Sequence, residues 1–304
     1  MANAAGLTAP GANVERRTRE RTPASLRALV SMERIKIVKR PMTWITLLIL
    51  VAATAAIVIL AYVTIHASNI DPVRKASRLN NFILPTGIQR SFEISGFFGQ
   101  IVLVVIAASM VGAEFSWGTI RMMVGTGVAR SKLLLAKLIA LTLTTIVFLV
   151  LAVAAGTFAS FLVTVISGHT LTLGTVNSAW WGDLALMTVR GFFVLWVMMV
   201  LAFSIASITR STAAGIAVGI GWPFLERIGT ALLGLIGSIG DTINKWLIST
   251  NSNALIAHSG FGPQTIAKGT PTVWHAFGVL LLYSVVLLAI TFAIFRKRDI
   301  ASGS

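Results

Sequence analysis

Six long apolar runs constrain this chain more than any other feature of its sequence. A helix that crosses a bilayer needs about 20 mostly apolar residues. Runs of that kind, some extended by neighbouring apolar residues, occupy 43–65, 95–111, 138–167, 191–209, 211–225 and 272–295. Only 12% of the residues are charged, against about 25% in soluble domains. We therefore predict an all-α integral membrane protein with six transmembrane helices.

The placement of the basic residues predicts the orientation of these helices. The net charge is +15, which suggests nucleic acid at first, but the cations gather at the ends of apolar runs. Lys and Arg accumulate on the cytoplasmic side of membrane proteins. With six spans, most of the 25 basic residues fall on one side together with both termini. A seventh span at 228–240 would place the basic C-terminal end outside. We predict six spans with both termini cytoplasmic, and a re-entrant or interfacial segment at 228–240.

The N-terminal region divides into two parts. Residues 1–23 carry few large apolar side chains, which predicts a disordered cytoplasmic tail. Residues 24–40 have apolar residues on one helical face and cations beside it, although Glu33 interrupts the apolar stripe. This pattern predicts an amphipathic helix in the membrane interface, and a basic flank that only fixes topology is the alternative. The interfacial-helix residues that we single out are Arg27, Glu33, Arg34 and Lys36. Residues 41–299 then form the six-span domain, and 300–304 a short tail.

A polar, basic island at 111–137 separates the second and third apolar runs. Glu114 stands there among cations, at the point where the second run ends. Gly118, Gly125 and Gly127 are expected to break the chain into a short helix parallel to the membrane. An ordinary cytoplasmic loop is the simpler interpretation. The elaborate composition favours a docking element for another protein.

The chain shows no catalytic or metal-binding constellation. Its four histidines are far apart, and it has no cysteine. It also has no GxxxxGK[ST] loop, so the sequence gives no basis for nucleotide hydrolysis. We predict no catalytic residue, no metal site and no cofactor bound by this chain.

The segment after the fifth run carries a possible pathway or re-entrant site. Trp222 and Pro223 are followed by the charged pair Glu226 and Arg227. Ionisable residues inside a membrane are costly and often functional. A position at the level of the lipid headgroups is the equally open alternative.

The island resembles a known family. The strings E-F-S-W-G-T-I-R at 114–121 and G-V-A-R-S-K-L-L-L-A-K at 127–137 are similar to the cytoplasmic loop of permease subunits in type-2 ATP-binding-cassette exporters. The resemblance includes the basic interfacial helix, the six spans, the re-entrant stretch and the closing F-R-K-R-D at 295–299. It implies a coupling helix that fits a groove on an ATPase subunit. The positions it implies for ATPase coupling are Glu114, Phe115, Gly118, Thr119, Arg121, Arg130 and Ser131.

The resemblance also implies partners and a location. Two copies of a separate ATPase subunit would bind ATP and Mg²⁺, and a second permease, identical or different, would complete the assembly. The expected location is the plasma (inner) membrane of a prokaryote, with lipid as the surroundings and no nucleic acid partner. The second and fifth spans would line a route for an amphipathic or hydrophobic substrate such as a drug, lipid or peptide. Its apolar lining would include Phe97, Phe98, Val102, Ile106, Ile216, Ile220, Trp222 and Phe224.

A channel or ion-coupled carrier that uses no ATP is the alternative. Such proteins usually carry buried acids in their spans, or broken helices in corresponding halves. Only the region 223–240 has such features here, and the first half has no counterpart.

Overall fold

The computed structural model describes residues 25–117, 128–168, 176–259 and 269–297. Within these ranges the chain forms ten α-helices and one 3₁₀ turn, and no strand. The elements are α1 (Leu26–Lys39), α2 (Pro41–Ala67), α3 (Pro72–Asn80), α4 (Gly87–Ser116), α6 (Arg130–Ile166), α7 (Ser178–Thr209), α8 (Thr212–Leu233), the turn η2 (Gly234–Ile236), α9 (Ser238–Asn244), α10 (Ile248–Ala257) and α11 (Val273–Lys297). The all-α prediction is confirmed for these residues.

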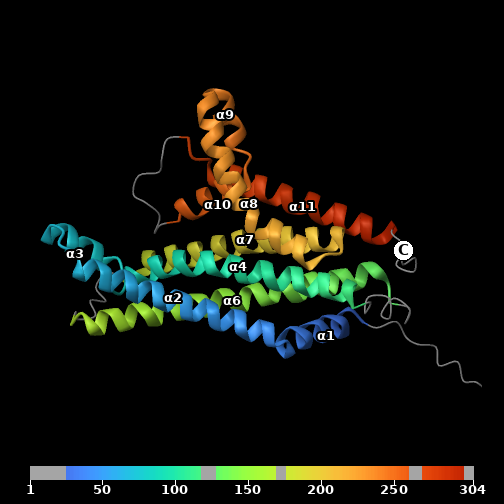
Figure 1. Ribbon diagram of the computed structural model, residues 1–304, viewed down its shortest axis with the longest axis horizontal. Helices are drawn as coiled ribbons and strands as arrows, with labels where there is room; N and C mark the ends of the chain where they lie inside the picture. Colours follow the sequence, from blue (N-terminus) through green and yellow to red (C-terminus); the bar gives the residue numbers. More distant parts are fainter. Residues whose placement is uncertain (1–24, 118–127, 169–175, 260–268, 298–304) are drawn as a thin grey trace, which may run out of the picture.

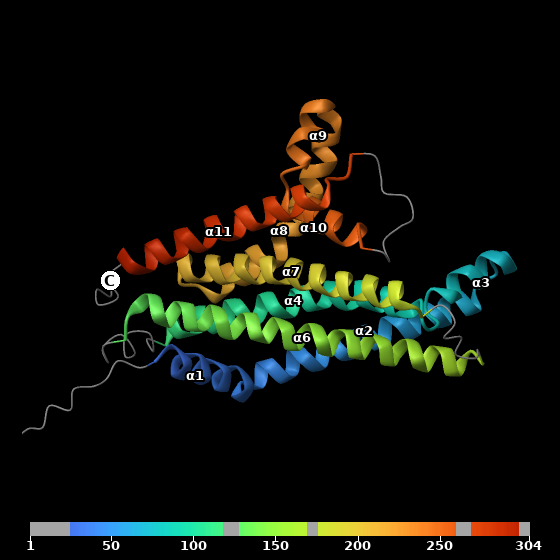
Figure 2. The same cartoon turned by 180° about the vertical axis from the view of Figure 1, so that it is seen from behind.

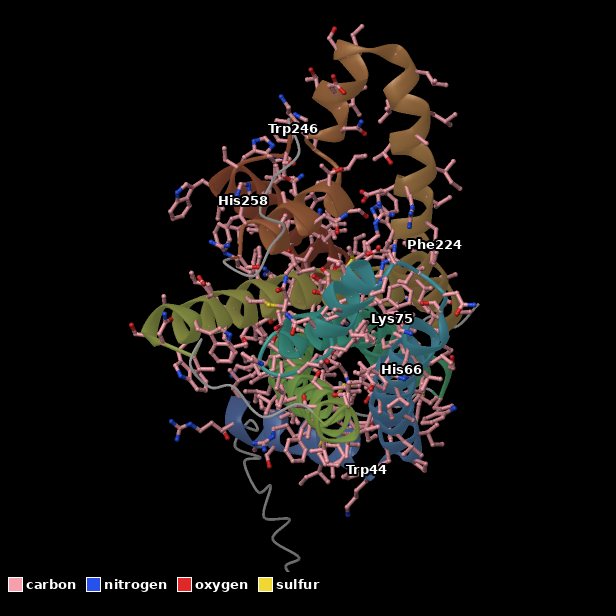
Figure 3. All side chains as sticks on the ribbon, turned by 90° about the vertical axis from the view of Figure 1, so that its left-hand side faces the viewer. Trp44, His66, Lys75, Phe224, Trp246 and His258 are labelled. Carbon is pink, nitrogen blue, oxygen red and sulfur yellow. The ribbon has the colours of Figure 1, made fainter. Side chains whose placement is uncertain are left out.

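Six of the described helices are long and apolar enough to cross a membrane. They are α2, α4, α6, α7, α8 with its following turn, and α11. Large apolar side chains cover the outside of the bundle, among them Trp44, Leu48 and Trp274, which are 58%, 69% and 83% exposed. Trp44 lies at the periphery in Figure 3. An apolar exterior of this kind suits lipid, and the architecture is that of a multi-pass membrane protein.

The helix boundaries differ from the apolar runs in an informative way. α4 begins at Gly87 and α7 at Ser178, well before the runs predicted at 95 and 191. The early turns contain charges, such as Arg90 and Glu93, which form an exposed ion pair of 2.7 Å. Helical hydrogen bonding continues past an apolar run wherever side chains can reach a polar surface. Hydropathy therefore underestimates the lengths of α4 and α7.

α4 and α7 form the centre of the bundle. They are the most buried of the six long helices, and α4 contacts α2, α6, α7 and α8. Figures 1 and 2 show α2, α4, α6, α7 and α11 running along the long axis of the molecule. We call the two ends of the bundle the α1 end and the α3 end, after the short helix found at each (Figure 1).

The turns at the α1 end follow from local sequence. Ser25 begins α1 by accepting a hydrogen bond from Ala28 N, at 3.3 Å, as N-cap serines do. Arg40 is extended before Pro41, which opens α2, because proline disfavours a helical residue before it and suits the first helical position. Arg210 links α7 to α8 in the left-handed region, at φ 57°.

The region predicted to be re-entrant forms a helical hairpin. α8 continues through Pro223 to Leu233, so the fifth helix is longer than the predicted span, and α9 returns beside it. Gly240 of α9 lies directly against the backbone of Leu233. The hairpin projects from the bundle, with Phe224 at its base (Figure 3), because an interior proline bends a helix. Re-entry into a membrane at 228–240 stays a prediction.

Small residues let α8 approach the centre of the bundle closely. A Cβ atom added to Gly215 would lie 2.8 Å from the Cβ atoms of Ala108 in α4 and Ala206 in α7. Small residues allow this kind of backbone approach between membrane helices. A Cβ at Gly221, in the same helix, would meet nothing within 4 Å.

These two glycines give a matched test of the packing. Gly215→Ala is expected to destabilise the protein by about 1–3 kcal/mol, because the added methyl overpacks a close contact. Gly221→Ala is expected to be neutral or stabilising by about 0.5–1 kcal/mol, since alanine suits a helix interior better than glycine. Thermal unfolding of the purified variants in one detergent measures both. Equal unfolding temperatures would contradict the close approach of α8.

Candidate functional site

Four charged side chains form a closed ring of ion pairs at the α1 end. Glu33 and Lys36 come from α1, Glu114 from the last turn of α4, and Lys137 from α6. Lys36 Nζ lies 2.8 Å from Glu33 Oε1 and 2.9 Å from Glu114 Oε1. Lys137 Nζ lies 2.8 Å from Glu33 Oε2 and 2.6 Å from Glu114 Oε2. Each cation therefore contacts both carboxylates, and the ring has no net charge.

Three of the four members are almost completely buried. The residues Glu33, Glu114 and Lys137 are 0%, 2% and 1% exposed, whereas the Lys36 side chain is 26% exposed. Burying a charge is expensive unless an opposite charge and hydrogen bonds replace its water. A buried pair contributes little net stability, but losing one partner is strongly destabilising. The ring therefore fixes the relative positions of α1, α4 and α6.

The ring explains the irregularity in the first helix. Glu33 interrupts an otherwise apolar stripe, yet it is buried on the same face as Leu29 and Ile37. It occupies a core position because Lys137 and Lys36 meet it there. A residue that breaks an amphipathic pattern can thus be a partner of a buried charge on another helix.

Lys137 is a site residue that the sequence did not predict. It is the last residue of the island at 111–137, but it lies inside α6, among the apolar residues Leu134, Ala136 and Leu141 of that helix's buried side. A single lysine within an apolar helical run is a signal for a buried acidic partner.

Phe115, next to Glu114, contacts the other side of the bundle. Its ring lies 6.1 Å from that of Phe295 in α11, in an edge-to-face arrangement. The guanidinium of Arg210, between α7 and α8, lies 5.8 Å from the Phe115 ring centroid. Such contacts favour a fixed geometry. The last turn of α4 thus contacts α1 and α6 through Glu114, and the α7–α8 link and α11 through Phe115.

The remaining predicted coupling residues are only partly described. Arg130 and Ser131 begin α6 at the same end of the bundle. Gly118, Thr119 and Arg121 lie outside the described residues, as does the short helix predicted between Gly118 and Gly127. In the first helix, Arg27 and Arg34 are exposed, as a polar helix face requires.

A third buried acid, after Glu33 and Glu114, lies in the half of α8 nearer the hairpin. Glu226 is 6% exposed, and its Oε1 accepts hydrogen bonds from Trp222 Nε1 at 2.8 Å and from Ile248 N at 2.9 Å. Its Oε2 accepts from Ser249 N at 2.5 Å. Ile248 and Ser249 are the first residues of α10, and a carboxylate at a helix N-terminus satisfies otherwise unpaired N–H groups. Glu226 therefore attaches α10 to α8.

α10 was not predicted from the sequence. The region 241–271 is polar and rich in Asn, Ser and Gly, which favours a loop. Its buried apolar face consists only of Ile248, Ala254 and Leu255, and the partner that caps it is 22 residues away in the chain. A short helix that depends on a distant carboxylate leaves little signal in its own segment.

Residues 55–301 match a family described as protein of unknown function, DUF2705. The chain belongs to this family. The match includes Glu114, Lys137 and Glu226, whereas Glu33 and Lys36 precede it. The DUF2705 description names no activity.

A curated protein of Bacillus subtilis (strain 168), "Uncharacterized protein YhcI", is similar to this chain. The two are 24% identical over 207 residues, which is 66% of this chain and 64% of that protein. The chain therefore spans less than two thirds of the length of this relative.

Removing one member of the ring is expected to destabilise the protein. Lys137→Met leaves two buried carboxylates with only the half-buried Lys36 between them, so we expect a loss of about 3–5 kcal/mol in unfolding free energy. Lys132→Met, an exposed site in the first turn of the same helix, is the matched control and should change little. Denaturant unfolding in detergent measures both. Similar stabilities for the two variants would show that the ring does not form.

Proposed function

We propose that this chain is the permease subunit of an ATP-driven exporter of the type-2 ATP-binding-cassette class, working with a separate ATPase subunit. The loop strings at 114–121 and 127–137 support the proposal through their similarity to the ATPase-docking loop of such permeases. The substrate would be amphipathic or hydrophobic, and it would leave the cytoplasm or the inner leaflet.

The observation that carries the proposal is the position of Glu114 and Phe115. These residues form the last turn of α4, where the proposed docking loop begins. Glu114 is ion-paired to α1 and α6, and Phe115 contacts Phe295 and Arg210. A force applied to the loop would therefore act at once on the ends of most of the long helices. A docking element needs that property to transmit movement.

The assembly would contain two permeases and two ATPase subunits, with the α1 end in the cytoplasm. ATP-driven closure of the ATPase dimer would push on the loop and on α1. ATP binding can shift the permeases between two arrangements only if ATP binds more tightly in one of them. The hairpin of α8 and α9 exposes Leu232, Leu235 and Ile239, an apolar surface that suits lipid or the second permease.

An ion-coupled carrier is the competing function, and the hydrogen bonds that the Glu226 carboxylate already accepts disfavour it. A carrier for cations needs acidic oxygens that can take up and release an ion. The Glu226 oxygens already accept hydrogen bonds from Trp222, Ile248 and Ser249. No group of three or more His, Cys, Asp or Glu side chains suited to a metal ion occurs in the described ranges.

Capture of an ATPase tests the proposal. The tagged chain is co-expressed with any ATP-binding-cassette ATPase encoded beside it and purified in mild detergent. It should retain that ATPase and stimulate its ATP hydrolysis. Arg121→Ala is expected to lower capture and stimulation about tenfold, because a charge-assisted contact is lost. Arg74→Ala, in α3 at the other end, is the control and should have no effect.

The unfolding temperatures of the variants distinguish a defect in docking from a defect in folding. A role for Arg121 in docking alone predicts that Arg121→Ala leaves the unfolding temperature unchanged. An ATPase that is never captured, by the original chain or by any variant, would overturn the exporter proposal and favour the carrier.

A further inference from the structure

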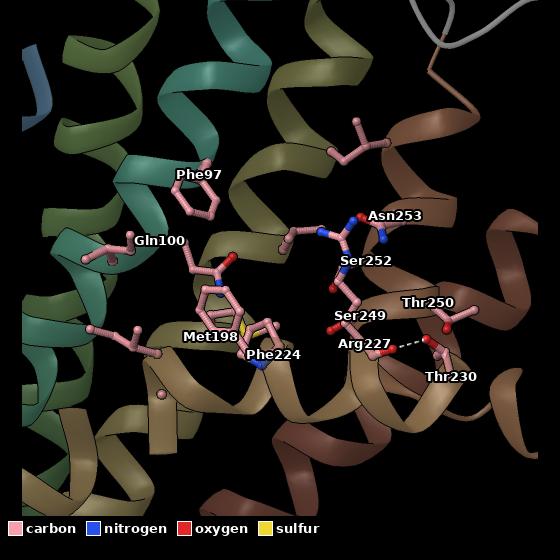
Figure 4. A pocket seen from close by; sticks show the side chains of 16 residues that line it. Phe97, Gln100, Met198, Phe224, Arg227, Thr230, Ser249, Thr250, Ser252 and Asn253 are labelled. Atoms are coloured by element: carbon pink, nitrogen blue, oxygen red, sulfur yellow. Dashed lines mark hydrogen bonds between the residues drawn. The ribbon is translucent and has the colours of Figure 1, made fainter. Parts of the chain in front are cut away.

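A cavity of about 620 Å³ lies between α4, α7, α8 and α10. Its volume is within the range of about 300–1,000 Å³ typical of small-molecule sites. Figure 4 shows Phe97 and Gln100 on one side and Ser249, Ser252 and Asn253 on the other. One side of the cavity is therefore polar, and the other is apolar except for the amide of Gln100.

The polar side has unused hydrogen-bonding capacity. The hydroxyl oxygens of Ser249 and Ser252 are buried, and neither has a hydrogen-bond partner among the described residues. Ser252 is only 6% exposed and lines the cavity. Leaving a buried polar group unpaired costs about 1–3 kcal/mol. A ligand with acceptor oxygens would satisfy both hydroxyl groups.

Arg227 adds a positive charge to the same wall. Its side chain lines the cavity and forms no ion pair within the described ranges. The adjacent carboxylate of Glu226 is engaged elsewhere, because it accepts hydrogen bonds from the first residues of α10. Arg227 is exposed, so its guanidinium is accessible to a ligand at this wall.

The opposite side suits a hydrocarbon chain. Phe97, Met198 and Phe224 line the first cavity, and Phe97 also lines a second cavity of about 410 Å³ beside it. The two cavities share further residues of α4, α7 and α10, so they adjoin. The second extends along α4 past Phe92 and Leu195. A mainly apolar passage thus runs away from the polar wall, although Glu93, Gln100 and Asn253 also line it.

We propose that this site binds an amphiphile whose head is a phosphate ester and whose tail is an acyl chain. The phosphate oxygens accept hydrogen bonds from the Arg227 guanidinium and the Ser249 and Ser252 hydroxyl groups. Arginine suits this role because its planar fork of donors matches the geometry of phosphate. The tail lies along Phe97 and into the second cavity. The site rests on its own geometry and does not depend on the exporter proposal.

Three probes distinguish the contribution of the phosphate head to binding from that of the acyl tail. The purified full-length chain in detergent is mixed with dioctanoyl phosphatidylglycerol, with dioctanoylglycerol, which lacks the phosphate, or with inorganic phosphate. Native mass spectrometry then measures the bound fraction of each. The phospholipid should bind at least tenfold more tightly than either other probe. Equal binding of dioctanoylglycerol would overturn the role of the phosphate, and equal binding of inorganic phosphate would overturn the role of the tail.

Variants locate the binding. Arg227→Gln should weaken phospholipid binding about tenfold to a hundredfold, since a hydrogen bond to a charged group is lost. Arg227→Lys keeps the charge but loses the fork of donors, so its affinity should lie between those of the original chain and Arg227→Gln. Ser252→Ala should weaken binding about threefold to tenfold with Arg227 intact, which keeps the test valid if Arg227→Gln misfolds. Arg74→Gln, in α3, is the matched control. Full phospholipid affinity in both Arg227→Gln and Ser252→Ala would overturn the proposal.

Discussion

The burial of Lys137 is the constraint on which the rest of the α1 end depends. An ammonium group removed from water needs compensating negative charge, and Lys137 finds it in Glu33 and Glu114. These acids come from two other helices, so α1 must lie along α6, and the last turn of α4 must reach both. The half-buried Lys36 balances the second carboxylate. The position of the first helix is thus determined by electrostatics as much as by its apolar face.

The long helices could be predicted from hydropathy and charge, because each long helix contains a continuous run of apolar residues. Six apolar runs became six described helices long enough to cross a membrane. The sequence could not predict the helix ends, because polar turns continue a helix beyond its apolar run. It also could not predict α10, whose first N–H groups depend on Glu226, a residue distant in sequence.

The charged residues show where reading one segment at a time fails. Glu33 and Glu114 were selected from the sequence, but as separate features of two segments. Lys137 joins them only in three dimensions. For Glu226 and Arg227, the sequence left open a position among lipid headgroups or within a span. The structure places both in α8 and separates their roles, since Glu226 caps α10 and Arg227 lines a cavity.

The glycines of α8 determine which parts of the molecule can move separately. Gly112 of α4 lies against Thr212, while Gly215 and Gly219 of α8 lie against Ala108 and Val104. With no side chains to act as spacers, rotation or sliding of either helix would drive atoms into the neighbouring backbone. The first half of α8 and the second half of α4 therefore behave as one rigid body. Pro223 follows this contact, and the hairpin begins beyond it (Figure 3). A change of shape in α8 is therefore confined to the part from Pro223 onward, and Glu226 would make α10 move with that part.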